Sequence, residues 1–305
     1  MEVGTYGQFP VPLVLKREDT LDWLPLNPGE LKIQQVLRNI VSSSVFDDDT
    51  IVSRGYRRGT IVNVGAHECF FCLFGALTGH RLFAVEPLPA CVAGVKETFA
   101  LYPQKLCDRV TLYNNYVSHI ATEFDTPVET CAGNYGANLN MTSSRSEPVA
   151  TVALDELPFA NEDISILAID TEGAELDVLA SAMGIFRKKF VNHLFFEYTP
   201  MWYRERSAFD VHGAIELLDE IIIRQNYRCY ILADMQDRIS DTQQVDLKEV
   251  FLRDWNTTTT EGQTDIYCTR CARWLRVANT NPLLDPVKVT ELCYEFSSTV
   301  QYGVQ

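Results

Sequence analysis

The chain has 305 residues, 46% of them apolar, which suffices for one large α/β domain with extensions or for two small domains. Its net charge of −15 gives a surface that repels phosphate backbones, which argues against nucleic acid as a partner. No apolar run reaches about 18 residues, so no membrane span is expected, and the amino terminus lacks the basic start of a signal peptide.

An extension of residues 1–57 comes first. It is irregular and punctuated by prolines up to residues 27–30, which are typical of a turn and a helix start. Apolar residues with helical spacing follow, so a helix should cover the main domain: Leu31, Ile33, Val36, Leu37, Ile40 and Val41. The main domain should span residues 58–270, and residues 271–305 form a carboxyl-terminal tail.

The stretch from Thr60 to Pro87 predicts strand, glycine turn, helix and strand, which is half of a parallel α/β unit. Ile61–Val64 is the first strand, and a tight turn follows at Gly65–His67. Apolar Cys69–Thr78 has the length of a helix, and Leu82–Val85 is the second strand.

Two positions in this unit carry chemistry. Gly65 stands where the strand turns into the helix, and a side chain there would clash with a closely approaching ligand. The free N–H groups at the start of the helix suit a carboxylate or a phosphate. Glu86 lies 21 positions beyond Gly65 and can accept both ribose hydroxyls of a nucleoside. The plainer alternative for Glu86 is a charge at a strand end.

The chain then continues with a helix at Pro89–Tyr102, a third strand at Arg109–Tyr113 and a short strand at Tyr116–His119. Residues 121–148 are polar and rich in turn residues, so we expect a long loop that acts as a flap over the substrate side. Val149–Leu154 is strand-like.

A second motif follows at residues 164–182. Ile164–Ile169 is a continuous apolar run, as a buried parallel strand requires. Asp170 stands at its carboxyl end, Gly173 breaks the chain, and Ala174–Ala182 is a predicted helix. Because open parallel sheets bind ligands outside the carboxyl ends of their strands, Asp170 should lie where atoms react.

Three carboxylates lie within six residues: Asp170, Glu172 and Glu175. Like charges this close raise the pKa of one member and make it a better proton acceptor. Alternatively, Glu172 and Glu175 cap the following helix and compensate its dipole.

The last third of the domain contains one more strand with an acidic residue at its carboxyl end. Asn192–Tyr198 is a strand that contains His193, a structural histidine, and ends beside Glu197. Thr199–Arg206 should be an aromatic and basic loop, whose Trp202 and Tyr203 either stack on a sugar face or pack under the loop. The remaining elements are a helix, a strand, a helix and a last strand: Phe209–Arg224, Tyr227–Leu232, Leu247–Trp255 and Thr264–Thr269.

Nine cysteines are scattered through apolar surroundings, and we expect free buried thiols in a reducing, cytoplasmic compartment. Two pairs have the CxxC spacing that can chelate zinc: Cys69 with Cys72, and Cys268 with Cys271. These pairs lie in a predicted helix and at the end of a predicted strand, far apart along the chain. Core thiols without a metal are therefore the preferred interpretation.

The two motifs resemble class I S-adenosylmethionine methyltransferases, and especially the FkbM-type family. That family usually has D-V-G-A-N-x-G and a later E-P, against N-V-G-A-H-E-C and Glu86-Pro87 here; its D-V-E-G-A-E closely matches D-T-E-G-A-E from Asp170. The resemblance covers about residues 58–270. It implies a Rossmann-like, doubly wound, mostly parallel seven-stranded sheet with one antiparallel strand. The chain departs from the first motif at Asn63, His67 and Cys69.

The resemblance implies an S-adenosylmethionine-dependent O-methyltransferase whose small-molecule or glycan acceptor is a sugar, glycolipid or natural product. The candidate bases are, in order of preference, Asp170, Glu197 and His67. The expected cofactor contacts are Asn63, Gly65, Ala66, Glu86, Asp170 and Tyr116, the last near the adenine ring. The expected acceptor contacts are Glu172, Trp202 and Tyr203, and no metal is expected.

Two alternatives remain open. A nicotinamide-dependent oxidoreductase would share the fold and the ribose-binding acid, but the chain lacks G-x-G-x-x-G. A non-catalytic binding protein with a methyltransferase fold is suggested by the three changed positions in the first motif.

Overall fold

The computed structural model describes most of the predicted main domain, namely residues 59–67, 69–77, 79–100, 102, 104–127, 131, 145–232, 244–256 and 264–270. The predicted amino-terminal cover helix and the carboxyl-terminal tail lie outside these residues. Residues 128–130 and 132–144 of the predicted flap also lie outside them.

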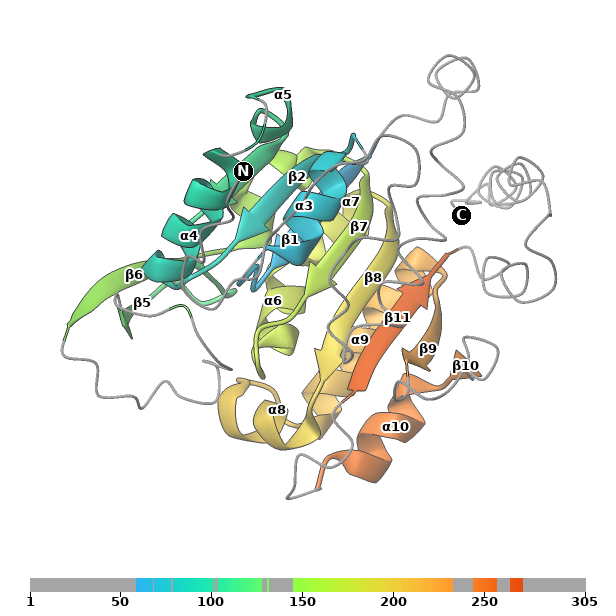
Figure 1. Ribbon diagram of the computed structural model, residues 1–305. Coiled ribbons are helices and arrows are strands. Elements are labelled where there is room, and N and C mark those ends of the chain that lie inside the picture. Colours follow the sequence, from blue (N-terminus) through green and yellow to red (C-terminus); the bar gives the residue numbers. More distant parts are fainter. Residues whose placement is uncertain are drawn as a thin grey trace, which may run out of the picture.

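A mostly parallel sheet forms the centre of the described structure, in the order β10-β9-β11-β8-β7-β1-β2-β3 (Figure 1). Neighbouring strands from β3 to β8 pair in parallel, and β11 runs antiparallel to both β8 and β9. The predicted fold class is therefore confirmed. The bounds are β1 Thr60–Val64, β2 Arg81–Val85, β3 Val110–Tyr113, β7 Ile164–Ile169, β8 Val191–Tyr198, β9 Arg228–Leu232, β10 Gln244–Val245 and β11 Thr264–Thr269.

The strand count differs from the expected seven with one antiparallel member. Within the described residues, β10 is an eighth strand of two residues and pairs antiparallel with β9. The antiparallel placement of β11 agrees with the expectation. So short an edge strand carried no apolar run by which the sequence could have predicted it.

Both faces of the sheet are covered, which explains the continuous apolar strands. Alternate residues of β1 serve two hydrophobic cores, with Val62 and Val64 in one and Ile61 in the other. Helices α6, α7 and α9 lie behind the sheet in Figure 1, and α3 lies in front of it. Helix bounds are α3 Phe70–Leu77, α4 Pro89–Ala100, α5 Gln104–Cys107, α6 Glu175–Ser181, α7 Met183–Lys188, α8 Pro200–Arg206, α9 Val211–Gln225 and α10 Leu247–Asp254.

The helix ends follow from local chemistry. The side chain of Asp210 accepts a hydrogen bond from the N–H of Gly213 (2.8 Å) and caps the start of α9. Asn226 ends that helix in the left-handed region, with φ 53°. None of the described helices has both the length and the apolar character needed to cross a bilayer.

A small second sheet corrects the predicted loop at residues 121–148. Its order is β4-β6-β5, with β4 Tyr116–Val117, β5 Glu123–Pro127 and β6 Ser146–Val152. Part of the expected flap therefore forms strands. The strand expected at Val149–Leu154 begins earlier, at Ser146, and belongs to the small sheet. Most of β5 and the first three residues of β6 are exposed, so these residues do not show the apolar pattern that predicts a strand. Short 3₁₀ turns at Leu154–Glu156 and Pro158–Asn161 lead back to β7.

The prediction of free core thiols is wrong for six cysteines. The structure pairs them as disulfides between Cys69 and Cys72, Cys91 and Cys131, and Cys229 and Cys268. The Sγ of Cys107 lies 3.0 Å from the backbone carbonyl oxygen of Phe99, and Cys271 lies outside the described residues. The argument for a reducing, cytoplasmic compartment rested on free thiols, and it no longer holds for these residues.

His193 is the structural histidine that we expected. Its Nδ1 lies 2.8 Å from the hydroxyl of Tyr267 and 3.1 Å from that of Thr269. Burial lowers the pKa of His193 to about 3, so the ring stays neutral inside the core.

Candidate functional site

The predicted site residues meet at one edge of the sheet. The carboxyl ends of β1, β2, β7 and β8 lead to Gly65, Glu86, Asp170 and Glu197. β1 lies between β2 and β7, so the strand order reverses at β1. Ligands of open α/β sheets bind outside the carboxyl ends of the strands at such a reversal.

Gly65 joins the two motifs. Its N–H and that of Ala66 donate to the carbonyl of Val85 (2.9 and 3.2 Å), which closes the turn against β2. Gly65 has φ 74°, and a Cβ atom there would come within 1.7 Å of the backbone oxygen of Asp170. Only glycine fits this position, because the end of β7 occupies the space of a side chain.

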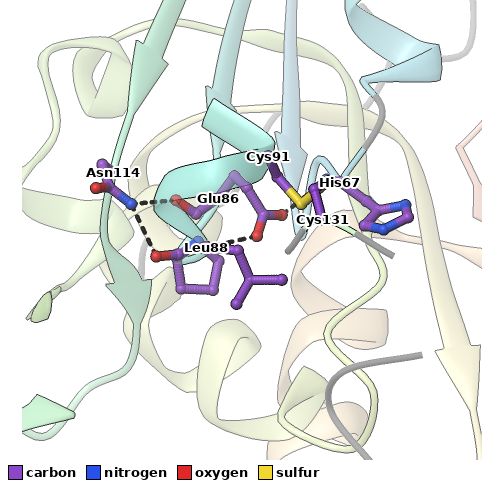
Figure 2. The surroundings of a disulfide bond; sticks show 7 residues. His67, Glu86, Leu88, Cys91, Asn114 and Cys131 are labelled. Atoms are coloured by element: carbon purple, nitrogen blue, oxygen red, sulfur yellow. Dashed lines mark hydrogen bonds between the residues drawn. A yellow bond between two sulfur atoms is a disulfide. The ribbon is translucent and has the colours of Figure 1, made fainter. Parts of the chain in front are cut away.

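Glu86 is buried and held from both sides (Figure 2). The N–H of His67 donates to its Oε2 (2.7 Å), and the N–H of Leu88 donates to its Oε1 (2.9 Å). Burial raises the pKa of Glu86 to about 7, against the lowering effect of these two hydrogen bonds. Asn114, which sequence analysis missed, donates from Nδ2 to the backbone carbonyls of Glu86 and Pro87 (3.0 and 2.8 Å).

Glu175 builds the loop that carries Asp170 and Glu172. Its carboxylate accepts from the N–H of Thr171 (2.7 Å), the hydroxyl of Thr171 (3.0 Å) and the N–H of Gly173 (3.0 Å). Burial is also the main cause that raises the pKa of Glu175 to about 7. These donors precede α6, so the carboxylate of Glu175 holds the turn before the helix and does not cap the helix start.

Asp170, Glu175 and Glu197 form a carboxylate cluster, with oxygen atoms within 4.8 Å of one another. Asp170 is accessible to solvent, whereas Glu197 is buried. Protein atoms around Asp170 replace much of the bulk water and raise its pKa to about 6. The spacing would also suit a hard divalent cation, but Glu175 already uses both oxygens on its own loop.

Glu172 lies beside this cluster in a constrained conformation. Its φ is 55°, and its backbone carbonyl accepts from Arg206 of α8. Burial, and then the charge of Asp170, raise the pKa of Glu172 to about 7. Its Oε2 is buried and has no hydrogen-bond partner within the described part of the chain. A buried acceptor of this kind needs an explanation, and a ligand hydroxyl is one.

Tyr116 lies in β4 of the small sheet. Its hydroxyl accepts from the hydroxyl of Thr126 (3.2 Å), and its ring packs on Phe124. Burial raises the pKa of Tyr116, and the charge of Glu86 adds to the rise. This coupling places Tyr116 in the neighbourhood of Glu86.

Trp202 and Tyr203 are not in the aromatic loop that we expected. Residues 200–206 form helix α8, which Pro200 begins, since proline suits the first turn of a helix. Tyr203 is fully buried, packs on Tyr198 and Phe251, and donates to the backbone carbonyl of Glu197. These contacts favour the alternative in which Tyr203 packs in the core. Trp202 is also buried, and Arg206 lies over its ring.

A family model described as Methyltransferase FkbM domain matches residues 63–229, more than half of the chain. The chain belongs to the FkbM methyltransferase family. It is therefore an S-adenosylmethionine-dependent methyltransferase, which excludes the nicotinamide alternative. No curated protein matches the chain.

Solved methyltransferase structures resemble this FkbM protein only distantly. A precorrin-6y C5,15-methyltransferase from Geobacter metallireducens GS-15 shares 12% identity at a TM-score of 0.36, over 77% of this chain and 87% of that one. The N-terminal domain of human METTL16 shares 11% identity at a TM-score of 0.40, over 81% and 71%. Such TM-scores are too low to assign function.

The departures of this FkbM protein from the family motif now have a structural description. His67 and Cys69, which replace Asn and Gly, have φ values of 42° and 61°. Both positions thus take the left-handed conformation that Asn and Gly tolerate best. Asn63 and Ala66 are both buried beside this turn.

The cysteines nearest the site were missed as site residues. The His67 ring lies with the sulfur atoms of Cys91 and Cys131, within 4.8 Å, rather than in the cluster around Asp170. Cys91 and Cys131 are 40 residues apart, and nothing in their spacing indicates that they pair.

Proposed function

We propose that this FkbM methyltransferase methylates a hydroxyl of a sugar, glycolipid or natural product, with Asp170 as the general base. The observation that carries the proposal is the position of Asp170: it ends β7, is accessible to solvent, and lies with Glu197 and Glu175. The acidic net charge of −15 favours a small-molecule or glycan acceptor over a nucleic acid.

The reaction is an in-line displacement. The acceptor oxygen forms a bond to the methyl carbon, the carbon–sulfur bond breaks, and its electron pair stays on sulfur. The hydroxyl proton passes to Asp170, whose pKa of about 6 leaves it ionised at neutral pH. Most of the acceleration comes from holding the two reacting groups in line.

Glu86 is the proposed ribose ligand. Two of its lone pairs are used by the N–H groups of His67 and Leu88, and about two remain for ribose hydroxyls, since a carboxylate offers about four. The backbone of Gly65 and Ala66 is the proposed contact of the cofactor at the turn after β1. Asn63 is a further proposed cofactor contact, and Tyr116 is the proposed neighbour of the adenine ring.

Glu172 is the proposed acceptor ligand, because its Oε2 is buried without a hydrogen-bond partner among the described residues. Glu197 is the second candidate base, since it shares the cluster with Asp170. His67 is the third, although its ring lies by the cysteines. A metal remains outside the proposed mechanism.

Replacing Asp170 tests the proposal. We predict that Asp170→Asn lowers turnover by about 10²–10⁴-fold, the usual contribution of a positioned acid–base group, while S-adenosylmethionine affinity changes little. The measurement is methyl transfer from labelled cofactor to a pool of glycosides and polyols, with calorimetry for binding. Wild-type turnover should rise with pH through an apparent pKa of about 6.

Asp163 provides a matched control. It precedes the other end of β7 and accepts from the N–H of Phe190 (3.0 Å), so Asp163→Asn should keep normal turnover. Normal turnover in Asp170→Asn would show that Asp170 is not the base, and Glu197 and His67 would be tested next. A wild-type protein that binds the cofactor and methylates nothing in broad extracts would favour the non-catalytic alternative.

A further inference from the structure

The Cys91–Cys131 disulfide lies beside Glu86, the proposed ribose ligand (Figure 2). Cys91 is buried in the first turn of α4, and Cys131 comes four residues after β5 of the small sheet. Their sulfur atoms and a ring nitrogen of His67 lie within 4.8 Å of one another. The disulfide therefore lies where the His67 turn, the start of α4 and Cys131 meet.

The His67 turn and the chain just before α4 both hold Glu86. One oxygen is held by the N–H of His67 in the turn, and the other by the N–H of Leu88, three residues before Cys91. The lone pairs left for a ribose point correctly only if both donors keep their places. The disulfide fixes Cys131 to the start of α4, and the His67 ring lies against its two sulfur atoms, so the disulfide limits how far either donor can move.

We propose that the Cys91–Cys131 disulfide is a positioning element of the cofactor site: it fixes Cys131 to the start of α4 beside the His67 ring, and so keeps the two N–H donors of Glu86 in place for binding the cofactor ribose. Opening the disulfide lowers the affinity for S-adenosylmethionine. The inference rests on the proposed function in one respect, the role of Glu86 as ribose ligand. Neither cysteine touches the reacting atoms.

The opening step needs a dithiol reductant, such as dithiothreitol. The sulfur–sulfur bond between Cys91 and Cys131 takes up two electrons and two protons and yields two thiols. The reductant supplies both and closes its own disulfide.

The test compares S-adenosylmethionine affinity by calorimetry in three forms of the full chain. The forms are the oxidised wild type, the variant Cys91→Ser/Cys131→Ser, and the control Cys229→Ser/Cys268→Ser, which loses the disulfide between β9 and β11. The first variant should bind about 5- to 150-fold more weakly, the usual range for coupled sites, and the control should match wild type. EDTA is present throughout, because thiols freed beside His67 could bind zinc.

A second measurement uses the reciprocity of linked equilibria. If the disulfide raises cofactor affinity, saturating S-adenosylmethionine must make Cys91–Cys131 harder to reduce by the same factor. Redox titration with dithiothreitol, followed by thiol alkylation and mass spectrometry, measures this for each disulfide separately. The Cys229–Cys268 equilibrium should stay unchanged, which a general stabilisation of the fold would not allow.

Combining the variants separates the two possible failures. Glu86→Gln should weaken S-adenosylmethionine binding in wild type. It should weaken binding much less in the Cys91→Ser/Cys131→Ser background, because both changes disturb the same contact between Glu86 and the ribose. No effect of Glu86→Gln in wild type would remove Glu86 from the proposed cofactor site. Cofactor affinity within twofold of wild type in Cys91→Ser/Cys131→Ser, or equal losses in both double-serine variants, would overturn the positioning role.

Discussion

At the scale of single residues, Gly65 links the two motifs and should be the least replaceable position of the site. Gly65→Ala would force a side chain into the left-handed region and against the backbone oxygen of Asp170. We predict that the free energy of unfolding falls by about 2–5 kcal/mol, the sum expected for backbone strain and overpacking. Urea denaturation followed by circular dichroism measures it.

Gly213 is the control for this prediction. It lies in the first turn of α9, where an added Cβ would meet Phe209 at 3.3 Å. Alanine also favours helix by about 1 kcal/mol, so Gly213→Ala should change stability by less than about 1 kcal/mol. Equal losses in the two alanine variants would show that the Asp170 contact does not decide the outcome.

The residues that could be predicted were those whose position follows from a strand end. Glu86 and Asp170 each stand at the end of an apolar run, so spacing alone placed them at one edge of the sheet. Tyr203 could not be assigned, because its burial depends on Tyr198 and Phe251 from other elements. Aromatic side chains carry no sequence signal that separates a ligand contact from a core contact.

At the scale of elements, the turn between β7 and α6 depends on the buried carboxylate of Glu175. Glu175→Ala would leave the N–H groups of Thr171 and Gly173 without their acceptor. We predict a loss of about 1.5–3 kcal/mol in unfolding free energy, the range for hydrogen bonds to a charged group. Turnover should also fall, because Asp170, the proposed base, and Glu172, the proposed acceptor ligand, lie in this turn.

Glu220 offers a comparison on the surface. It pairs with Arg187 and Arg224, and exposed ion pairs contribute about 0–1 kcal/mol. Glu220→Ala should therefore cost little in the same denaturation experiment. A Glu175→Ala variant as stable as Glu220→Ala would mean that the turn holds its shape without the carboxylate.

Elements with continuous apolar runs could be predicted closely, and elements without them could not. β7 and β11 match their predicted bounds. β5 lies mostly in solvent, so its sequence resembles that of a loop. Helix α8 is short and begins at a proline, and seven residues rich in aromatic and basic side chains do not show a helical period.

At the scale of the whole molecule, the site carboxylates make stability depend on pH. Burial raises the pKa values of Glu86 and Glu175 to about 7 and that of Asp170 to about 6, from ordinary values of 4.5 and 3.8. Between those limits the folded chain binds more protons than the unfolded chain, so these groups lower the unfolding free energy as pH rises. Buried His193, with its lowered pKa, acts in the opposite direction below about pH 6.5.

Comparing wild type with Glu86→Gln isolates the contribution of Glu86 to the pH dependence of stability. Glutamine cannot ionise, so the melting temperature of the variant relative to wild type should increase as pH rises from about 4.5 to about 7 and then level off. Differential scanning calorimetry without cofactor measures this across the pH range. A constant difference between the two proteins would mean that Glu86 titrates near its ordinary pKa in the folded chain.

The Cys229–Cys268 disulfide also means that the chain can be cut between β9 and β11 without separating the two fragments. The two cysteines are 39 residues apart and face each other across the β9–β11 pair, so β10 and α10 lie inside a covalently closed loop. A single cut in that loop leaves both fragments in one molecule, with β11 still seated between β8 and β9. New chain ends or an inserted reporter domain could therefore be placed there without releasing the last strand from the sheet.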